Sequence, residues 1–291
     1  METAKPYRGR FAPSPTGPLH MGSLLAAMGS WLLARQAGGH WLIRIEDIDP
    51  PREIEGAASG QIELLKRFGM ESDESVLWQS TRDGRYLEVL QKLIASGDAF
   101  ECFCSRKDLL EYQGIHRACI SKNAEKNPAI RLRIPDIAIE FDDLIQGHFS
   151  QAVGRETGDM VIRRADGFWA YQLAVVVDDA DQGITHIVRG MDLLESTPRQ
   201  IYLQRLLEFA TPEYAHLPLV VDSSGHKLSK SLAAFPLDPD NPIAAMRIVW
   251  KLLGQEMANW PDGGAPERLL LQAITRFDAM KIPRGSQMPT A

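Results

Sequence analysis

A histidine stands at the start of a predicted helix in the stretch "RFAPSPTGPLHMGS", residues 10–23. The first backbone N–H groups of a helix lack intrahelical partners and carry partial positive charge, so a helix N-terminus attracts anions. Gly17 and Gly22 let a phosphate approach the backbone, and His20 can donate a hydrogen bond to a phosphate oxygen. The pattern indicates a seat for a nucleoside triphosphate. Taken alone, a short His-x-Gly motif more often marks a residue that caps or packs the turn.

A second motif, "HKLSKS" at residues 226–231, carries Lys227 and Lys230 in a polar loop, with hydroxyl donors at Ser229 and Ser231. Two ammonium groups three residues apart suit the negative charge that builds on a departing pyrophosphate. Catalysis would then consist of positioning and electrostatic stabilisation rather than covalent chemistry. A solvated surface loop is the alternative, because lysine and serine are common in loops.

The elements that position the first motif predict a parallel sheet. Residues 7–12 predict a strand, and the apolar spacing within 23–36 predicts a helix that ends at a Gly-Gly pair. Residues 40–49, "HWLIRIEDID", predict a buried strand. Strand, helix and strand in this order form a βαβ unit. Further helices are predicted over 53–69 and 83–96.

The second half of the sheet is predicted at residues 167–190, "GFWAYQLAVVVDDADQGITHIVRG". The valine run at 175–177 predicts a strand buried on both faces. A helix follows over 197–209, with Thr197 as N-cap and Pro198 at its first position. The stretch "LPLVVD" predicts one more strand, which leads into the lysine loop.

These elements predict four regions along the chain. They are the first half of a Rossmann-type catalytic domain (1–100), an insertion that holds the cysteines (101–155), the second half with the lysine loop (156–235), and a short helical region that ends in a loose tail, "MKIPRGSQMPTA" (236–291).

The bulk composition restricts the class of protein. The net charge of −6 argues against a protein that coats polyanions. No run of about 18 apolar residues is present to span a membrane, and the first residues lack the apolar segment of a signal peptide. We therefore expect a cytoplasmic protein with no membrane partner. We also expect a monomer, although the composition does not bear on the oligomeric state.

Together the two motifs resemble the signatures of class I aminoacyl-tRNA synthetases, His-Ile-Gly-His and Lys-Met-Ser-Lys-Ser. Here they read "HMGS" at residues 20–23 and "KLSKS" at 227–231, so Ser23 replaces the second histidine. The resemblance implies that ATP, with Mg²⁺, is a substrate. It implies catalytic roles for His20, Lys227 and Lys230. The implied ATP-binding residues are Gly17, His20, Gly22, Ser23, Lys227, Ser229 and Lys230.

Three stretches resemble the glutamyl subgroup of that class: "RFAPSPTGPLHMGS", "RIEDIDPPR" and "ITHIVRGMDLLESTPRQIYL". A glutamate ligand carries two carboxylates and one ammonium, so two arginines and one acid are its minimum complement. The resemblance implies that Arg10 faces the side-chain carboxylate, that Glu46 takes the ammonium and that Arg189 lies near the α-carboxylate. The implied glutamate-binding residues are Arg10, Ala12, Ser14, Glu46, Tyr171 and Arg189. An ordinary structural salt bridge is the alternative for Glu46 and Arg189.

The stretch after the lysine loop is too short for the helical anticodon-binding portion of a full glutamyl-tRNA synthetase. The chain resembles most closely the glutamyl-queuosine tRNA(Asp) synthetases, a family of shortened paralogues. That family activates glutamate with ATP and attaches it to the queuosine base in the anticodon stem-loop of tRNA(Asp). The alternatives are a truncated glutamyl-tRNA synthetase that charges a tRNA 3′ end, a small-molecule nucleotidylyltransferase and a non-catalytic binding module.

Three cysteines lie close together in the insertion, and Zn²⁺ takes four ligands, usually Cys or His. His116 lies three residues before Cys119 in "GIHRAC", at a place where the resembled family can have a tyrosine. We predict a structural zinc site formed by Cys102, Cys104, His116 and Cys119. Tyr112 is the alternative fourth ligand, and reduced cysteines without a metal are the alternative to the site. The predicted fold class is α/β, a Rossmann-type parallel-sheet domain with a zinc-containing insertion and a short C-terminal helical portion.

Basic residues follow the cysteine cluster, and they fit either contacts with RNA phosphates or a solvated face. They are Arg117, Lys122, Lys126, Arg131 and Arg133.

Overall fold

The structure is a computed structural model that describes residues 6–121, 127–220 and 237–287. The lysine-loop residues Lys227, Ser229, Lys230 and Ser231 lie outside the described residues, as do Lys122 and Lys126.

The first half of the fold is the predicted βαβ unit. Strand β1 (Arg8–Phe11) pairs in parallel with β2 (His40–Ile45), and helix α1 (Met21–Gln36) connects them. Strand β2 pairs in parallel with β3 (Leu77–Trp78). Helix α2 (Ala57–Arg67) lies between β2 and β3 in the sequence. This part of the prediction is confirmed. Its signals are local: apolar periodicity in α1 and a mostly apolar run in β2.

The second half extends the sheet on the other side of β1. The amide of Thr185 donates to the carbonyl of Arg8 at 2.9 Å, which places β9 (His186–Gly190) beside β1. Strand β9 pairs in parallel with β10 (Glu213–Leu217), and β10 pairs with β6 (Ala138–Asp143). The other strands of the first half therefore lie on one side of β1, and those of the second half lie on the other side. Ligands bind at such a switch point, beyond the carboxyl ends of the strands.

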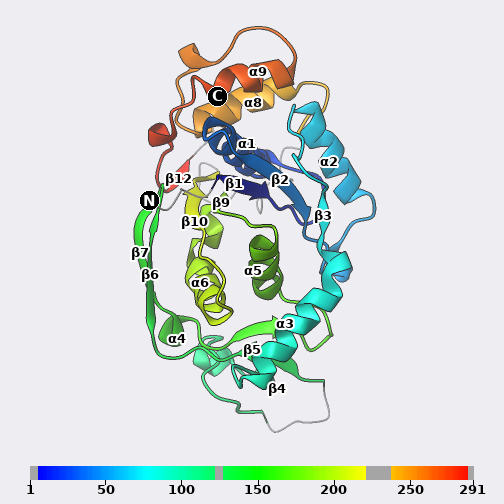
Figure 1. The fold of residues 1–291 in the computed structure, drawn as a ribbon, viewed down its shortest axis with the longest axis vertical. Coiled ribbons are helices and arrows are strands. Elements are labelled where there is room, and N and C mark those ends of the chain that lie inside the picture. Colours follow the sequence, from blue (N-terminus) through cyan, green and yellow to red (C-terminus); the bar gives the residue numbers. More distant parts are fainter. Residues whose placement is uncertain (1–5, 122–126, 221–236, 288–291) are drawn as a thin grey trace.

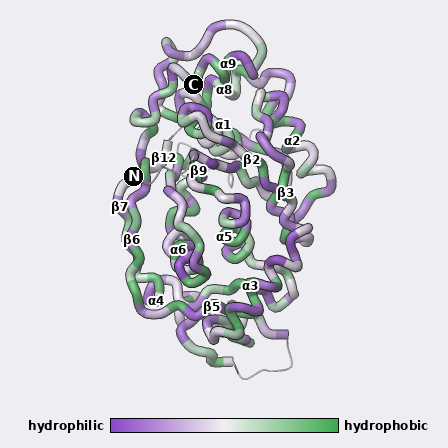
Figure 2. Tube along the Cα trace, viewed as in Figure 1, coloured by the Kyte–Doolittle hydropathy of each residue, from purple (hydrophilic) through white to green (hydrophobic). Residues whose placement is uncertain are grey.

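The prediction of a strand at residues 175–177 is wrong, because these valines lie in helix α5 (Tyr171–Asp181). All positions from Leu173 to Asp179 are buried, so the helix is apolar on nearly all sides and shows no 3.6-residue stripe. A short continuous apolar run does not separate a buried helix from a buried strand. Figure 2 shows hydrophobic residues along α5 in the interior of the molecule.

Two further boundaries differ from the prediction. Helix α6 (Thr197–Leu206) has Ser196, not Thr197, as its N-cap, and Pro198 lies in its first turn. The predicted strand "LPLVVD" is divided between the end of β10 and a separate strand β11 (Leu219–Val220). Pro218 separates the two strands, because proline offers no N–H for a continuous ladder.

The cysteine-containing segment forms a small antiparallel sheet of β4 (Ala99–Cys102), β5 (Ala129–Leu132) and β8 (Met160–Arg163). Helix α3 (Asp83–Ala95) leads into this sheet. Between β5 and β8, a hairpin of β6 and β7 (Gly147–Ala152) extends to β10, with which β6 pairs. Helix α4 (Val153–Glu156) follows the hairpin and leads back to β8. The small sheet lies at the opposite end of the molecule from the C-terminal helices (Figure 1).

Two apolar cores cover the two faces of the main sheet. Helix α1 packs on one face together with α8 (Pro242–Leu252) and α9 (Pro266–Ile274), whereas α3, α5 and α6 contribute to the other core (Figure 1). Within the described residues, no helix is both long and apolar enough to cross a membrane.

The prediction of a loose C-terminal tail is also wrong for the residues that the structure describes. Ile282 is buried, and the amide of Gly285 donates to Gln146 Oε1 at 3.0 Å. Strand β12 (Ser286–Gln287) pairs in parallel with β11. The polar residues, prolines and glycines of this segment suggested a loose tail, but its extended chain is held by a strand pairing and a hydrogen bond.

Replacing Trp250 should show that the C-terminal helices belong to the main core. Trp250 is fully buried, its ring lies edge-on to Trp260 at 5.4 Å, and its Nε1–H donates to the carbonyl of Glu256 at 3.0 Å. We expect Trp250→Ala to lower the free energy of unfolding by about 3–5 kcal/mol, measured by urea titration. Met280→Ala, at a 92% exposed side chain, is the control and should change it by less than about 0.5 kcal/mol. A loss below about 1 kcal/mol for Trp250→Ala would contradict this packing.

Candidate active site

His20 is the N-cap of α1. Its Nδ1 accepts a hydrogen bond from the backbone N–H of Ser23 at 3.2 Å. A Cβ at position 22 would lie 3.1 Å from His20 Cε1, so Gly22 makes room for the imidazole ring. Because Nδ1 accepts, the neutral ring carries its proton on Nε2, which is then a donor. The structure thus shows the capping role, and the contact with a phosphate stays a prediction.

The turn before His20 is held by Gln61, a buried residue of α2 that the sequence analysis did not find. Its Nε2 donates to the carbonyls of Ser14 at 3.1 Å and Gly17 at 2.7 Å. Gly17 has a φ of 147°, which strongly favours glycine there. The side chain of Ser14 is exposed, and Ala12 is half-buried directly after β1. The turn is therefore rigid where a phosphate would approach.

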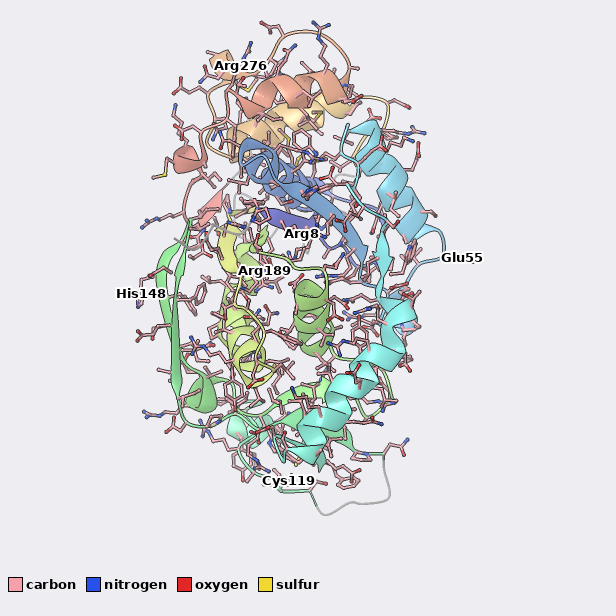
Figure 3. The ribbon with its side chains drawn as sticks, viewed as in Figure 1. Arg8, Glu55, Cys119, His148, Arg189 and Arg276 are labelled. Atoms are coloured by element: carbon pink, nitrogen blue, oxygen red, sulfur yellow. The ribbon has the colours of Figure 1, made fainter. Side chains whose placement is uncertain are left out.

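Four predicted glutamate-binding residues meet at the carboxyl ends of the central strands. Arg10 comes from β1, Glu46 directly follows β2, Tyr171 begins α5 and Arg189 lies in β9. Arg189 Nη1 donates to the Tyr171 hydroxyl at 3.4 Å. Burial raises the pKa of Tyr171, while the charges of Arg189 and Arg10 act against this rise. Figure 3 shows Arg189 near the middle of the molecule, between the main sheet and the helices beneath it.

Arg10 is held by an acid that the sequence analysis did not identify. Its Nε and Nη2 donate to the two carboxylate oxygens of Asp179, at 2.9 and 3.2 Å. Asp179 also pairs with Arg44 Nη1 at 2.8 Å. All three side chains are buried. The only signal in the sequence was a pair of acids, Asp178 and Asp179, at the end of an apolar run, and such a pair does not reveal its distant partner.

Glu46 is the least satisfied acid of the site. Its Oε1 is buried and has no hydrogen-bond partner among the described residues, and Arg44 Nη2 lies 3.7 Å away. Burial raises the pKa of Glu46 to about 7, although Arg44 and Arg10 favour its ionised form. Arg44 Nη2 likewise lacks a hydrogen-bond partner within the described chain. A buried polar group without a partner carries a desolvation cost that a bound ligand can remove.

Arg189 is oriented by hydrogen bonds and forms no ion pair with a carboxylate of the described residues. Its Nε donates to His216 Nε2 at 3.1 Å, and its Nη2 donates to Thr197 Oγ1 at 2.8 Å. His216 Nδ1 in turn donates to Asp143 at 2.6 Å. Burial lowers the pKa of His216, which favours the neutral ring that can accept from Arg189. Among the described residues, the salt-bridge alternative therefore finds no acidic partner for this guanidinium.

The cysteine cluster lies at the far end of the molecule, away from the main sheet (Figure 3). The ligand atoms of the four predicted residues, Cys102, Cys104, His116 and Cys119, all lie within 4.8 Å of one another. His116 Nδ1 contacts a carboxylate oxygen of Asp159 at 2.8 Å, which orients the ring and leaves Nε2 toward the thiols. A carboxylate behind a histidine ligand is typical of zinc sites.

His116 lies together with the three cysteines in this cluster, and the side chain of Tyr112, the alternative ligand, is about half exposed. Backbone N–H groups of Ile120 and Ser121 donate to Cys104 Sγ at 3.3 and 3.5 Å. Such bonds stabilise thiolates, so the donor set fits Zn²⁺.

One of the basic residues near this cluster has a structural role. Arg131 is buried, and it donates to Cys102 Sγ at 3.3 Å and to the carbonyl of Asp159 at 2.9 Å. It is therefore not a phosphate contact. Arg117 and Arg133 are exposed, so both earlier interpretations still apply to them.

The fold has known counterparts. A family model described as "tRNA synthetases class I (E and Q), catalytic domain" matches residues 7–235. The crystal structure of a glutamate tRNA ligase from Elizabethkingia meningosepticum is 25% identical, with a TM-score of 0.80 over 99% of this chain and 68% of that one. A glutamate-tRNA synthetase from Elizabethkingia anophelis is 26% identical, with a TM-score of 0.82 over the same shares. The fold defines a class I tRNA synthetase catalytic domain.

Relatives match nearly the whole chain. Proteins named Glutamyl-Q tRNA(Asp) synthetase from Xanthomonas campestris and Ectopseudomonas mendocina are 54% and 48% identical, over 98% and 100% of this chain. The matches cover 96% and 99% of those proteins. The chain therefore belongs to the glutamyl-Q tRNA(Asp) synthetase family of class I tRNA synthetases, which are ligases.

The free-energy cost of burying the ionised carboxylate of Glu46 should make the stability of the protein depend on pH. Because its folded-state pKa is raised from 4.5 to about 7, the folded protein binds a proton that the unfolded chain releases between these values. The wild-type protein without ligand should lose stability as pH rises through this window. Glu46→Gln removes the titrating group, so its unfolding free energy relative to wild type should rise by about 2–3 kcal/mol from pH 5 to pH 8. Urea titrations at both pH values measure this difference.

The exposed Glu55 provides the matched control, labelled in Figure 3. Glu55→Gln should show the same stability difference from wild type at both pH values. An equal response of the two variants would mean that burial of Glu46 is not the cause.

Proposed function

We propose that this chain activates L-glutamate with ATP to glutamyl-adenylate and then transfers the glutamate to the queuosine base in the anticodon of tRNA(Asp). The observation that carries the proposal is the buried charge cluster at the switch point of the sheet. Arg10 and Arg189 offer two guanidinium groups, and Glu46 offers an unpartnered carboxylate oxygen. This arrangement complements an amino acid with two carboxylates and one ammonium. The names of the relatives and their near-complete coverage support the transfer step.

In the proposed adenylation, His20 and the turn before α1 bind the ATP phosphates. His20 Nε2 donates to a phosphate oxygen, Gly17 and Gly22 allow its close approach, and Ser23 is a further ATP contact. Lys227 and Lys230, with Ser229, stabilise the charge on the departing pyrophosphate. Mg²⁺ accompanies ATP as part of the substrate. Arg189 and Tyr171 hold the α-carboxylate of glutamate close to the α-phosphorus of ATP. A carboxylate oxygen attacks this phosphorus as the bond to pyrophosphate breaks, so positioning supplies most of the catalysis.

In the proposed transfer, a ring hydroxyl of queuosine attacks the acyl carbon and AMP departs. Single-stranded loops with unstacked bases are the natural target of RNA readout, which suits an anticodon loop. We place the zinc-binding segment and its exposed residues Arg117 and Arg133 on the RNA-facing side. A cytoplasmic location, which the composition of the chain favours, and a monomeric state complete the proposal.

We also propose a structural zinc at Cys102, Cys104, His116 and Cys119. The close approach of these ligand atoms and the carboxylate behind His116 support it. The metal would tie β4 to the segment that follows it, because this part of the chain has only a small apolar cluster of its own.

Transfer to queuosine is tested with radiolabelled glutamate, ATP and two preparations of tRNA(Asp), with and without queuosine. We expect label only on the queuosine-containing tRNA, and nuclease mapping should place it in the anticodon fragment. Label on the 3′ end of tRNA(Glu) would instead establish the truncated glutamyl-tRNA synthetase. Glutamate-dependent pyrophosphate exchange without any tRNA should be robust, and background exchange would refute the activation step itself.

Removing the metal should loosen the zinc-binding segment and leave adenylate formation intact. Elemental analysis should find about one zinc per chain, and chelation should increase amide hydrogen exchange in residues 99–121. Pyrophosphate exchange should continue, because this cluster and the glutamate site lie in different parts of the fold. Cys119→Ser should lower zinc occupancy, whereas Tyr112→Phe should not. If exchange stops as soon as the metal is removed, the zinc is not merely structural.

A further inference from the structure

Two adjacent acids of α5 are both buried, and they hold different partners. Asp178 is fully buried. Its carboxylate accepts from Tyr86 Oη at 2.6 Å, from Gln79 Nε2 at 2.8 Å and from Arg82 Nε at 3.1 Å. These partners come from α3 and the turn before it, so Asp178 ties α5 to α3.

Asp179 pairs instead with Arg10, a predicted residue of the candidate glutamate site, and with Arg44. One of its oxygens lies 2.9 Å from Arg10 Nε and 2.8 Å from Arg44 Nη1, and the other accepts from Arg10 Nη2 at 3.2 Å. Asp179 thus stands between two buried guanidinium groups that would otherwise repel each other.

The bonds to Asp179 use one edge of the Arg10 guanidinium. Among the described residues, no group accepts a hydrogen bond from Arg10 Nη1, so this nitrogen is left for a ligand. A guanidinium fixed in this way loses little freedom when it binds a carboxylate. The carboxylate of Asp179 also sets the charge of the site.

Glutamate and glutamine differ in the charge that they bring to the buried guanidinium of Arg10. Arg10 and Arg44 share one carboxylate, that of Asp179, so two positive charges face one negative charge there. The side-chain carboxylate of glutamate would balance the second positive charge, whereas glutamine would leave it without a partner in a buried site.

We propose that Asp179 is a positioning residue that makes the amino-acid site selective for glutamate over glutamine, by fixing the guanidinium of Arg10 and balancing the charge of Arg44. The inference rests on the proposed role of Arg10 toward the substrate side chain. Asp179 itself touches neither substrate nor ATP. It acts through Arg10, so its loss should alter recognition of the side chain more than the chemical step.

The test is Asp179→Asn, which keeps the size of the side chain and removes its charge. Pyrophosphate exchange is measured with glutamate and with glutamine. We expect the KM for glutamate to rise at least tenfold, with kcat changed less than about threefold and the KM for ATP unchanged. The ratio of kcat/KM for glutamate to that for glutamine should fall at least tenfold. Both KM and this ratio are independent of the fraction of folded enzyme.

Asp178→Asn is the matched control, because it changes a neighbouring buried acid that does not contact Arg10. It should lower the unfolding temperature and leave the glutamate-to-glutamine ratio unchanged. Asp179→Glu keeps the carboxylate and should recover most of the ratio, which a merely structural role would not predict.

An unchanged ratio in Asp179→Asn overturns the inference, as does an equal fall in Asp178→Asn. Wild-type protein that activates no glutamate would instead refute the proposed function. The two failures are therefore distinguishable.

Discussion

A buried row of alternating charges holds the centre of this molecule together. Arg10, Asp179, Arg44 and Glu46 follow one another across β1, α5 and the end of β2. Buried charges are costly unless each is paired, so these side chains fix α5 against the two central strands. The row ends on Glu46, whose Oε1 has no hydrogen-bond partner among the described residues. The row of ion pairs therefore leaves at its end a carboxylate oxygen without a hydrogen-bond partner in the described chain, and this is where the proposed function places the ammonium group of glutamate.

Arg189, the second arginine of the site, is also held in place by a buried acid, but through an intervening histidine. Asp143 lies at the end of β6, in the hairpin of β6 and β7. Its carboxylate accepts a hydrogen bond from His216 in β10. His216 accepts from Arg189, and this bond requires a neutral ring with its proton on Nδ1. An acid thus orients each arginine, directly for Arg10 and through a histidine for Arg189. The hairpin thereby helps to fix the site.

The parts of this structure that the sequence predicts are those set by local pattern. The βαβ unit, the helix that begins after His20 and the spacing of the cysteines follow from residues close together in the chain. Helix α5 was missed because a helix buried on nearly all sides has no polar stripe. The pairing of Arg10 with Asp179 joins positions 169 residues apart, and no short-range pattern specifies it. Gln61 escaped prediction for the same reason, since its partners are backbone carbonyls of a distant turn.

His20 shows that a structural role and a chemical role can depend on each other. Its Nδ1 caps α1 by accepting from the amide of Ser23, and this bond fixes both the ring orientation and the tautomer. A ring that caps through Nδ1 must carry its proton on Nε2, the nitrogen that a phosphate oxygen requires as donor. Gly22 also keeps the ring in this position, because a side chain there would crowd the imidazole. The capping alternative considered for the sequence motif therefore does not compete with phosphate binding. The cap fixes Nε2 as the donor nitrogen of the neutral ring, which is the form that the proposed phosphate contact needs.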